Sequence, residues 1–138
     1  MKNFEFKSQV ATSIEQSKRL LELGLKKETA DMAHNKNTVI PKYKIVPVSD
    51  WGLLSELEEI TYIPAWSLHR LIEMMPEEMY GGLLCIFKDS IRYEEVIMDR
   101  LEAHFEVVGN NMYENAISCI EWLIKEGYFN KDYLEDKK

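Results

Sequence analysis

Residues 101–107 read LEAHFEV, and this stretch decides the fold because apolar and polar side chains alternate along it. The apolar side chains occupy every second position, at Leu101, Ala103, Phe105 and Val107. Successive side chains of a β-strand point to opposite faces of its sheet, so the alternation predicts a strand with one buried face.

Two more strands are predicted before this one, over residues 83–87 (LLCIF) and 91–98. Tight turns at Asp89-Ser90 and Asp99-Arg100 would join the three strands into an antiparallel meander. A helix over residues 91–108 is the competing interpretation, and the alternation of the last strand favours the sheet.

An amphipathic helix is predicted after the meander. Asn111 and Glu114 have the spacing of a capping box, and Gly127 stands where a left-handed C-cap would end the helix. The apolar residues recur at helical spacing, at Tyr113, Ile117, Ile120 and Ile124. We therefore expect this helix to pack on one face of the meander.

The N-terminal segment also predicts a helix. Thr12 and Glu15 have the spacing of a capping box, and Gly24 marks the expected end of the helix. Residues 25–32 (LKKETADM) would add a short second turn or helix.

The middle of the chain is predicted to contain a loop, a strand and two helices. The polar residues 33–42 form the expected loop, and residues 43–48 (YKIVPV) a short strand that its proline confines to a sheet edge or end. The helices are expected over residues 50–59 and, with Pro64 in the first turn, over residues 64–75.

These elements predict an α+β fold, with N-terminal helices before a three-stranded antiparallel meander and a C-terminal helix packed on it. A length of 138 residues fits one domain, residues 1–138. Residues 131–138 (KDYLEDKK) are expected to be a solvated tail.

The formal charge of −7 is unevenly spread along the chain. Residues 1–50 hold nine basic and six acidic side chains, whereas residues 51–138 hold eight basic and eighteen acidic ones. An acidic body disfavours nucleic-acid binding, because phosphate neutralisation requires basic groups. No apolar run approaches the roughly 20 residues of a membrane span, and the N-terminus does not resemble a signal peptide. A cytoplasmic protein without membrane contact is therefore predicted.

Three stretches carry a resemblance: QSKRLLELGLKKETADM (16–32), YIPAWSLHRLIEMMP (62–76) and ENAISCIEWLIKEGYF (114–129). In this order they resemble a group of short uncharacterised proteins from Bacteroidetes gut bacteria, their prophages and mobile elements. The IPAWSL segment is the most specific part. The resemblance implies an α+β domain in a bacterial or phage cytoplasm, and it implies no activity.

No catalytic, metal-binding or cofactor-binding residue is predicted. His34, His69 and His104 each stand alone in their segments, and the spacings of zinc sites and phosphate loops are absent from the sequence. Cys85 and Cys119 fall in apolar segments, where thiols are usually buried and unreactive. We therefore predict a protein without a cofactor that is not an enzyme.

Aromatic and methionine side chains of the middle segment form the predicted interaction surface: Trp51, Tyr62, Trp66 and Met75. Tryptophan and tyrosine dominate protein–protein hot spots, and methionine adapts to varied partners. The sequence thus predicts a small interaction or accessory protein of mobile-element origin, which binds another protein or itself. This hypothesis requires an exposed apolar patch around Trp51 and Trp66.

Two alternatives from other classes stay open. One is a small-molecule-binding or hydrolytic enzyme whose Glu, His and Tyr side chains meet only in the folded chain. The other is an acidic surface that mimics DNA, or a weak nucleic-acid module that uses the basic residues 1–50.

Overall fold

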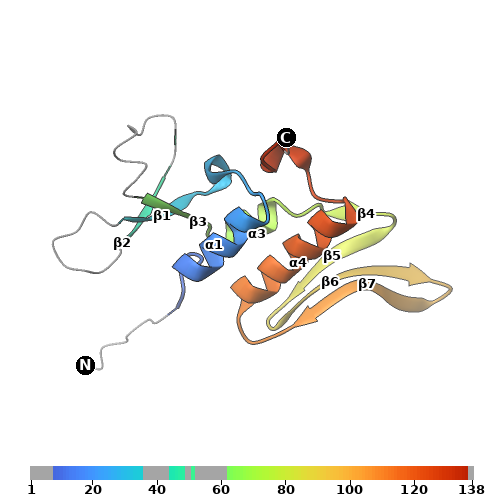
Figure 1. Ribbon diagram of the computed structural model, residues 1–138. Helices are drawn as coiled ribbons and strands as arrows, with labels where there is room; N and C mark the ends of the chain where they lie inside the picture. The colour runs from blue at the N-terminus through green and yellow to red at the C-terminus, as the bar shows by residue number, and fades with distance from the viewer. Residues whose placement is uncertain (1–7, 36–43, 49–50, 52–61, 137–138) are drawn as a thin grey trace, which may run out of the picture.

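The computed structural model describes residues 8–35, 44–48, 51 and 62–136, and it has an α+β fold with two antiparallel sheets (Figure 1). The α-helices are α1 Ile14–Glu22, α3 Leu68–Glu73 and α4 Met112–Glu126, and the short 3₁₀ helices are η1 Lys27–Thr29 and η3 Lys131–Tyr133. The strands are β1 Met32–Asn35, β2 Lys44–Pro47, β3 Tyr62–Ala65, β4 Glu78–Met79, β5 Gly82–Phe87, β6 Ser90–Ile97 and β7 Arg100–Val108. The predicted α+β class is confirmed, whereas the predicted single three-stranded meander is confirmed only in part.

The larger sheet contains the predicted meander. Its strand order is β4-β5-β6-β7, so the short β4 adds a fourth strand that the sequence analysis missed. Both turns lie one residue earlier than predicted, at Lys88-Asp89 and Met98-Asp99. Met98 and Asp99 have φ angles of 49° and 64°. Positive φ at both turn residues matches the right-handed twist of the strands that they join.

A β-bulge interrupts the pairing of β7 with β6. Tyr93 pairs with Phe105, but the next residue, Glu94, pairs with Ala103, so His104 is an extra residue on β7. One extra residue reverses which face each following side chain occupies.

The bulge divides the apolar residues of β7 between two faces of the sheet. Phe105 faces α4, and its ring centre lies 4.9 Å from that of Trp122. Leu101, which pairs with Val96, lies on the opposite face and is 69% exposed. The expectation that all four apolar residues share one buried face is therefore wrong.

Helix α4 packs on the four-stranded sheet as predicted (Figure 1). The Asn111 side chain accepts a hydrogen bond of 3.1 Å from the Glu114 backbone N–H, which caps the first turn. Gly127 ends the helix with a φ of 81°. Ile117 and Ile120 are completely buried between the helix and its neighbours.

Helix α1 begins one residue later than the predicted capping box. Ser13 Oγ accepts from the Gln16 N–H at 3.1 Å, and Gln16 Oε1 accepts from the Ser13 N–H at 3.0 Å. Thr12 is instead buried, and its Oγ1 accepts a bond of 3.0 Å from the Trp66 N–H. The predicted cap at Thr12 is wrong because a tertiary contact claims its hydroxyl.

The smaller sheet was not predicted. Its order is β2-β1-β3, and β1 lies partly in the expected loop. Strand β3 includes Pro64, so this proline does not open a helix, and α3 begins only after its cap at Ser67. Pro47 does lie in an edge strand, as predicted. The expected helix over residues 50–59 lies almost entirely outside the described residues.

The C-terminal segment is attached to the loop that follows α1, which differs from the expected solvated tail. The Lys26 N–H donates to the Tyr133 carbonyl at 2.9 Å, and the Glu135 N–H donates to the Gly24 carbonyl at 2.7 Å. Most side chains of residues 131–136 are nevertheless exposed.

Glu114 links the two long helices and gives a testable pH dependence. Its Oε1 accepts a bond of 2.9 Å from Gln16 Nε2, and its Oε2 lies 2.6 Å from Arg19 Nη1. The Gln16 bond and then the Arg19 contacts lower the pKa of Glu114. A carboxyl whose pKa is lower in the folded chain stabilises the fold above its unfolded pKa. That contribution is lost as the pH falls through the folded pKa.

We expect Glu114→Gln to reduce the free energy of unfolding by about 0.5 kcal/mol at pH 7, the scale of a half-exposed pair. The difference from the unaltered chain should shrink between about pH 5 and pH 3. Urea denaturation at several pH values measures it. Glu121→Gln, at an exposed position of the same helix, is the control. A deficit for Glu114→Gln that stays constant down to pH 3 would contradict the assignment.

Candidate functional site

The two tryptophans of the predicted interaction surface lie in the core. Trp66 is completely buried, and its Nε1–H donates to Thr29 Oγ1 at 2.9 Å. Trp51 is also buried, and its Nε1–H donates to the Ala30 carbonyl at 2.9 Å. Burying an indole is favourable when its N–H keeps a hydrogen-bond partner. The predicted exposed patch around these side chains is therefore wrong.

The other two predicted interaction residues do not restore that patch. Met75 is buried in the same core as Trp66. Tyr62, on β3, is half-buried and packs against this core. These four side chains thus contribute to packing and form no exposed apolar patch.

Two of the three histidines make separate local contacts. His34 on β1 is buried, and its Nε2 donates to the Thr12 carbonyl at 2.7 Å. His69 on α3 is exposed, with Nε2 3.6 Å from Glu73 Oε1 one turn away. No group of three or more His, Cys, Asp or Glu side chains within the described residues could hold a metal ion.

His104, the bulge residue, forms a close pair with a carboxylate. Its Nε2 lies 2.7 Å from Glu95 Oε2, on the side of the sheet that faces α4. Two glycines leave room for this pair. A Cβ atom would lie 2.8 Å from Glu95 Oε1 at Gly81, and 3.1 Å from His104 Cδ2 at Gly82. Such a pair can exchange a proton, but hydrolysis would also need an activated nucleophile.

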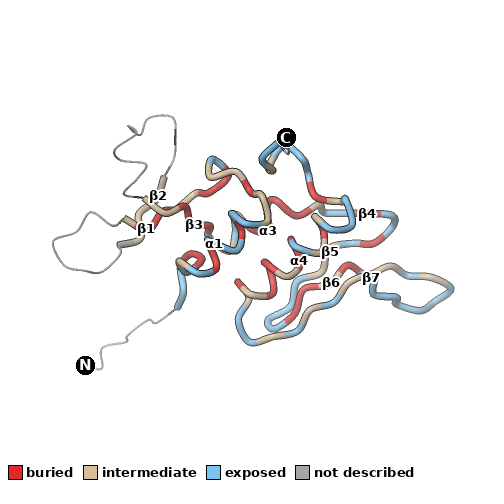
Figure 2. The backbone as a smooth tube through the Cα atoms, viewed as in Figure 1, coloured by how far each residue is buried: buried red, intermediate tan, exposed pale blue. Residues whose placement is uncertain are grey.

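The four-stranded sheet carries apolar side chains on the side that α4 does not cover. Leu84, Tyr93 and Phe105 face α4. The side chains that point to the other side of the same strands lie together there because of the strand pairing. We call this side the outer face. Each of its large apolar side chains is between 47% and 69% exposed: Leu83, Phe87, Val96, Leu101 and Val108. Figure 2 shows the exposed stretches along β7 and around the tip of the β6–β7 hairpin.

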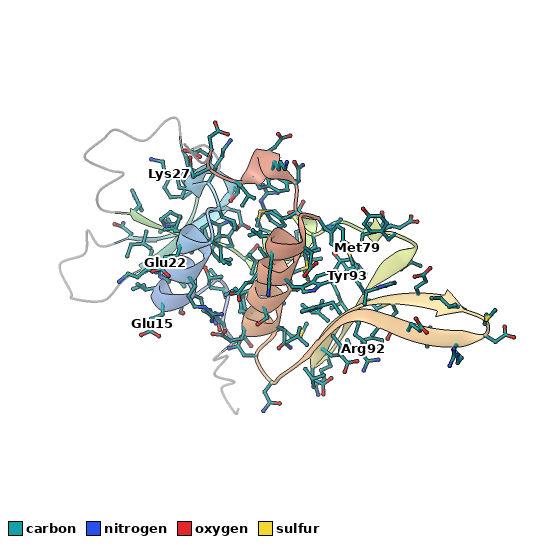
Figure 3. All side chains as sticks on the ribbon, turned by 45° about the vertical axis from the view of Figure 1, so that its right-hand side comes forward. Glu15, Glu22, Lys27, Met79, Arg92 and Tyr93 are labelled. Atoms are coloured by element: carbon teal, nitrogen blue, oxygen red, sulfur yellow. The ribbon has the colours of Figure 1, made fainter. Side chains whose placement is uncertain are left out.

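Arg92 stands at the centre of the outer face. Its Nη1 lies 3.1 Å from Glu94 Oε1, and its Nε lies 2.7 Å from Glu106 Oε2. The guanidinium also lies 4.9 Å from the centre of the Phe87 ring, within range of a cation–π contact. Figure 3 shows Arg92 and Tyr93 on opposite sides of β6.

The ionic cluster on the outer face has an excess negative charge. The hydrogen bond to Glu94 and the charge of Glu106 raise the pKa of Arg92, so the guanidinium is permanently cationic. One cation therefore faces two carboxylates. Apolar side chains around a net negative centre suit a partner that supplies both apolar surface and positive charge.

The free edge of β7 is less suited to binding than the outer face. Strand β7 is nine residues long and lies at the edge of its sheet. The bulge at His104 interrupts its backbone register, and Arg100, Glu102 and Glu106 place charges along it. Bulges and charged side chains are devices that prevent strand addition at an edge.

Comparisons of the chain with family models, curated proteins and solved structures found no match. Among the described residues, no helix is long and apolar enough to cross a membrane.

Proposed function

We propose that this chain is a non-enzymatic interaction protein that binds a partner protein through the outer face of the four-stranded sheet. The main support is the set of five exposed large apolar side chains on one side of a single sheet. Soluble proteins rarely expose clustered apolar side chains unless these bind something. The cytoplasmic and mobile-element context that the sequence resemblance implies stays a prediction.

The net charge of the outer face indicates the kind of partner that it binds. Covering the outer face would remove Arg92, Glu94 and Glu106 from water with one carboxylate in excess. A buried unpaired charge is strongly unfavourable, so the partner has to bring a basic side chain to this point. Residues 82–108 as a whole hold three basic and six acidic side chains, which attracts the same class of partner. The partner is thus an apolar protein surface with a central lysine or arginine.

A second copy of the chain is a poor occupant for the same reason. Two outer faces placed together would bring two excess carboxylates into one interface, and each chain carries a formal charge of −7. We therefore expect a monomer in sedimentation velocity experiments, whatever the protein concentration.

A peptide phage-display selection on the immobilised protein tests the proposed function. Selected peptides should combine apolar residues with lysine or arginine, and they should shift the amide NMR signals of β5, β6 and β7. Leu101→Asp should weaken their binding at least about tenfold, because it removes an apolar contact and adds a charge that the bound peptide would have to desolvate. Val10→Asp is the matched control, since Val10 is also an exposed apolar side chain but lies outside the sheet.

Two results would overturn the proposal. One is a set of peptides that bind the Leu101→Asp variant as tightly as the unaltered chain. The other is a stable dimer that Leu101→Asp dissociates, which would assign the outer face to self-association.

A further inference from the structure

Three aromatic side chains gather at the C-terminal end of α4, on the side of the sheet opposite to the outer face. The ring centres of Tyr80 and Tyr128 lie 5.2 Å apart at an interplanar angle of 65°. Those of Trp122 and Tyr128 lie 5.7 Å apart at 54°. We call these three residues the aromatic ledge. At these distances the neighbouring rings touch, so they form an inclined corner against which a small group could pack.

The aromatic ledge is accessible from solvent and firmly supported. Tyr80 is 78% exposed, and Trp122 and Tyr128 are partly exposed. Beneath them, Trp122 packs against Phe105 and Tyr93 at centroid distances of 4.9 Å and 6.0 Å. Trp122 is thus anchored on the core of the four-stranded sheet, and Tyr128 and then Tyr80 pack outward from it.

Negative charge lies next to the aromatic ledge. The Glu95 carboxylate lies against Gly81, the residue that follows Tyr80. Tyr128 follows the Gly127 cap of α4, where the helix dipole presents its negative end. Aromatic faces are themselves electron-rich. Lys125 in the last turn of α4 offsets part of the helix dipole, so the carboxylate of Glu95 and the electron-rich rings are the contributions that favour a cation.

Two other surface rings of the chain are each in contact with an arginine side chain. The Arg70 guanidinium lies 5.7 Å from the Tyr133 ring centre, and that of Arg92 lies 4.9 Å from Phe87. In the part of the chain that the structure describes, no arginine or lysine is placed in this way over the aromatic ledge. Within those described residues, the ledge therefore has the composition of a cation site that no side chain occupies.

We propose that the aromatic ledge binds a quaternary ammonium group. Glu95 Oε2 is hydrogen-bonded to His104, and Oε1 lies against Gly81, so the carboxylate acts mainly as a nearby charge. An ammonium with N–H groups would exchange its water for ring faces that accept hydrogen bonds poorly. A fully methylated ammonium has no N–H to satisfy and is well matched to aromatic faces.

Titration with choline chloride, followed by the Trp122 indole N–H signal in NMR spectra, tests this site. We expect saturable binding with a dissociation constant of about 1 mM, from a few ring contacts at an accessible site. The uncharged isostere of choline, 3,3-dimethylbutan-1-ol, should bind at least about tenfold more weakly, because it has the same shape without the charge.

Variants test whether choline binds at the aromatic ledge or at another exposed aromatic side chain. Tyr80→Ala should weaken choline binding about two- to fivefold, the contribution of one ring, and Glu95→Gln should also weaken it. Tyr133→Leu is the matched control, because the Tyr133 ring already holds Arg70 and should not contribute. Circular dichroism checks that each variant is folded.

A methylated peptide distinguishes two sources of the ammonium group, a methylated protein and a small ammonium compound. A trimethyl-lysine peptide that binds at least tenfold more tightly than choline would assign the site to a methylated protein, and equal affinity would assign it to small ammonium compounds. The proposal is overturned if tens of millimolar choline leaves the Trp122 signal unshifted. It is also overturned if the uncharged isostere binds as well as choline.

Discussion

Replacing Trp66 with alanine is expected to lower the free energy of unfolding by about 3–5 kcal/mol, the usual cost of truncating a buried tryptophan. The side chain is completely buried, and the change also removes the donor to Thr29 Oγ1. Small domains are stable by only about 5–15 kcal/mol, so the variant should be extensively unfolded in low denaturant. Urea denaturation followed by circular dichroism measures the effect.

Two variants make this result interpretable. Trp66→Phe keeps a large ring but loses the indole N–H, so it should fall between alanine and the unaltered chain. Tyr80→Ala removes an exposed ring and should change the free energy of unfolding by less than about 0.5 kcal/mol. If Trp66→Ala unfolded at the same urea concentration as the unaltered chain, Trp66 would not be a core residue. The sequence-based interface hypothesis would then regain support.

The parts of the fold that local chemistry determines were predictable. Helix α4 has its cap at Asn111, its left-handed end at Gly127 and its apolar stripe within one segment. The meander likewise joins neighbouring strands by two-residue turns. In both cases the residues that decide the structure lie close together in the sequence, so their pattern could be interpreted directly.

The smaller sheet could not be predicted because its strands are specified by partners far along the chain. Residues 62–65 pair with β1, thirty residues earlier in the chain. Pro64 suits the first turn of a helix as well as a short strand, and Ser67 is the residue that actually caps α3. Only the pairing with β1 decides between the two.

The candidate site was missed for a related reason. The alternation in residues 101–107 predicts one buried stripe, whereas the bulge at His104 turns Leu101 and Ala103 to the outer face. No glycine marks this bulge in the sequence. The opposite error arose at the tryptophans, because an aromatic side chain suits an interface as well as a core. Their burial depends on acceptors at Thr29 and Ala30, which the sequence pattern does not indicate.

The two cysteines should differ greatly in reactivity towards a thiol reagent such as DTNB. Cys119 on α4 is completely buried, and burial raises the pKa of its thiol to about 12. At pH 8 its thiolate fraction is therefore about a thousandfold below that of an ordinary thiol. Cys85 is only half-buried. In the native protein we expect one thiol to react readily and the other to stay protected.

Single-thiol variants assign the two reactions. Cys119→Ala leaves Cys85 and should keep the fast reaction, whereas Cys85→Ser leaves Cys119 and should react at least about a thousandfold more slowly. Concentrated guanidinium chloride should make both thiols react at similar rates, because unfolding exposes them equally. If Cys119 reacts in the native protein as fast as Cys85, then α4 separates from the sheet on the timescale of labelling. Since Trp122 is held against the sheet by that same contact, such opening would also displace Trp122 from the aromatic ledge and weaken ammonium binding.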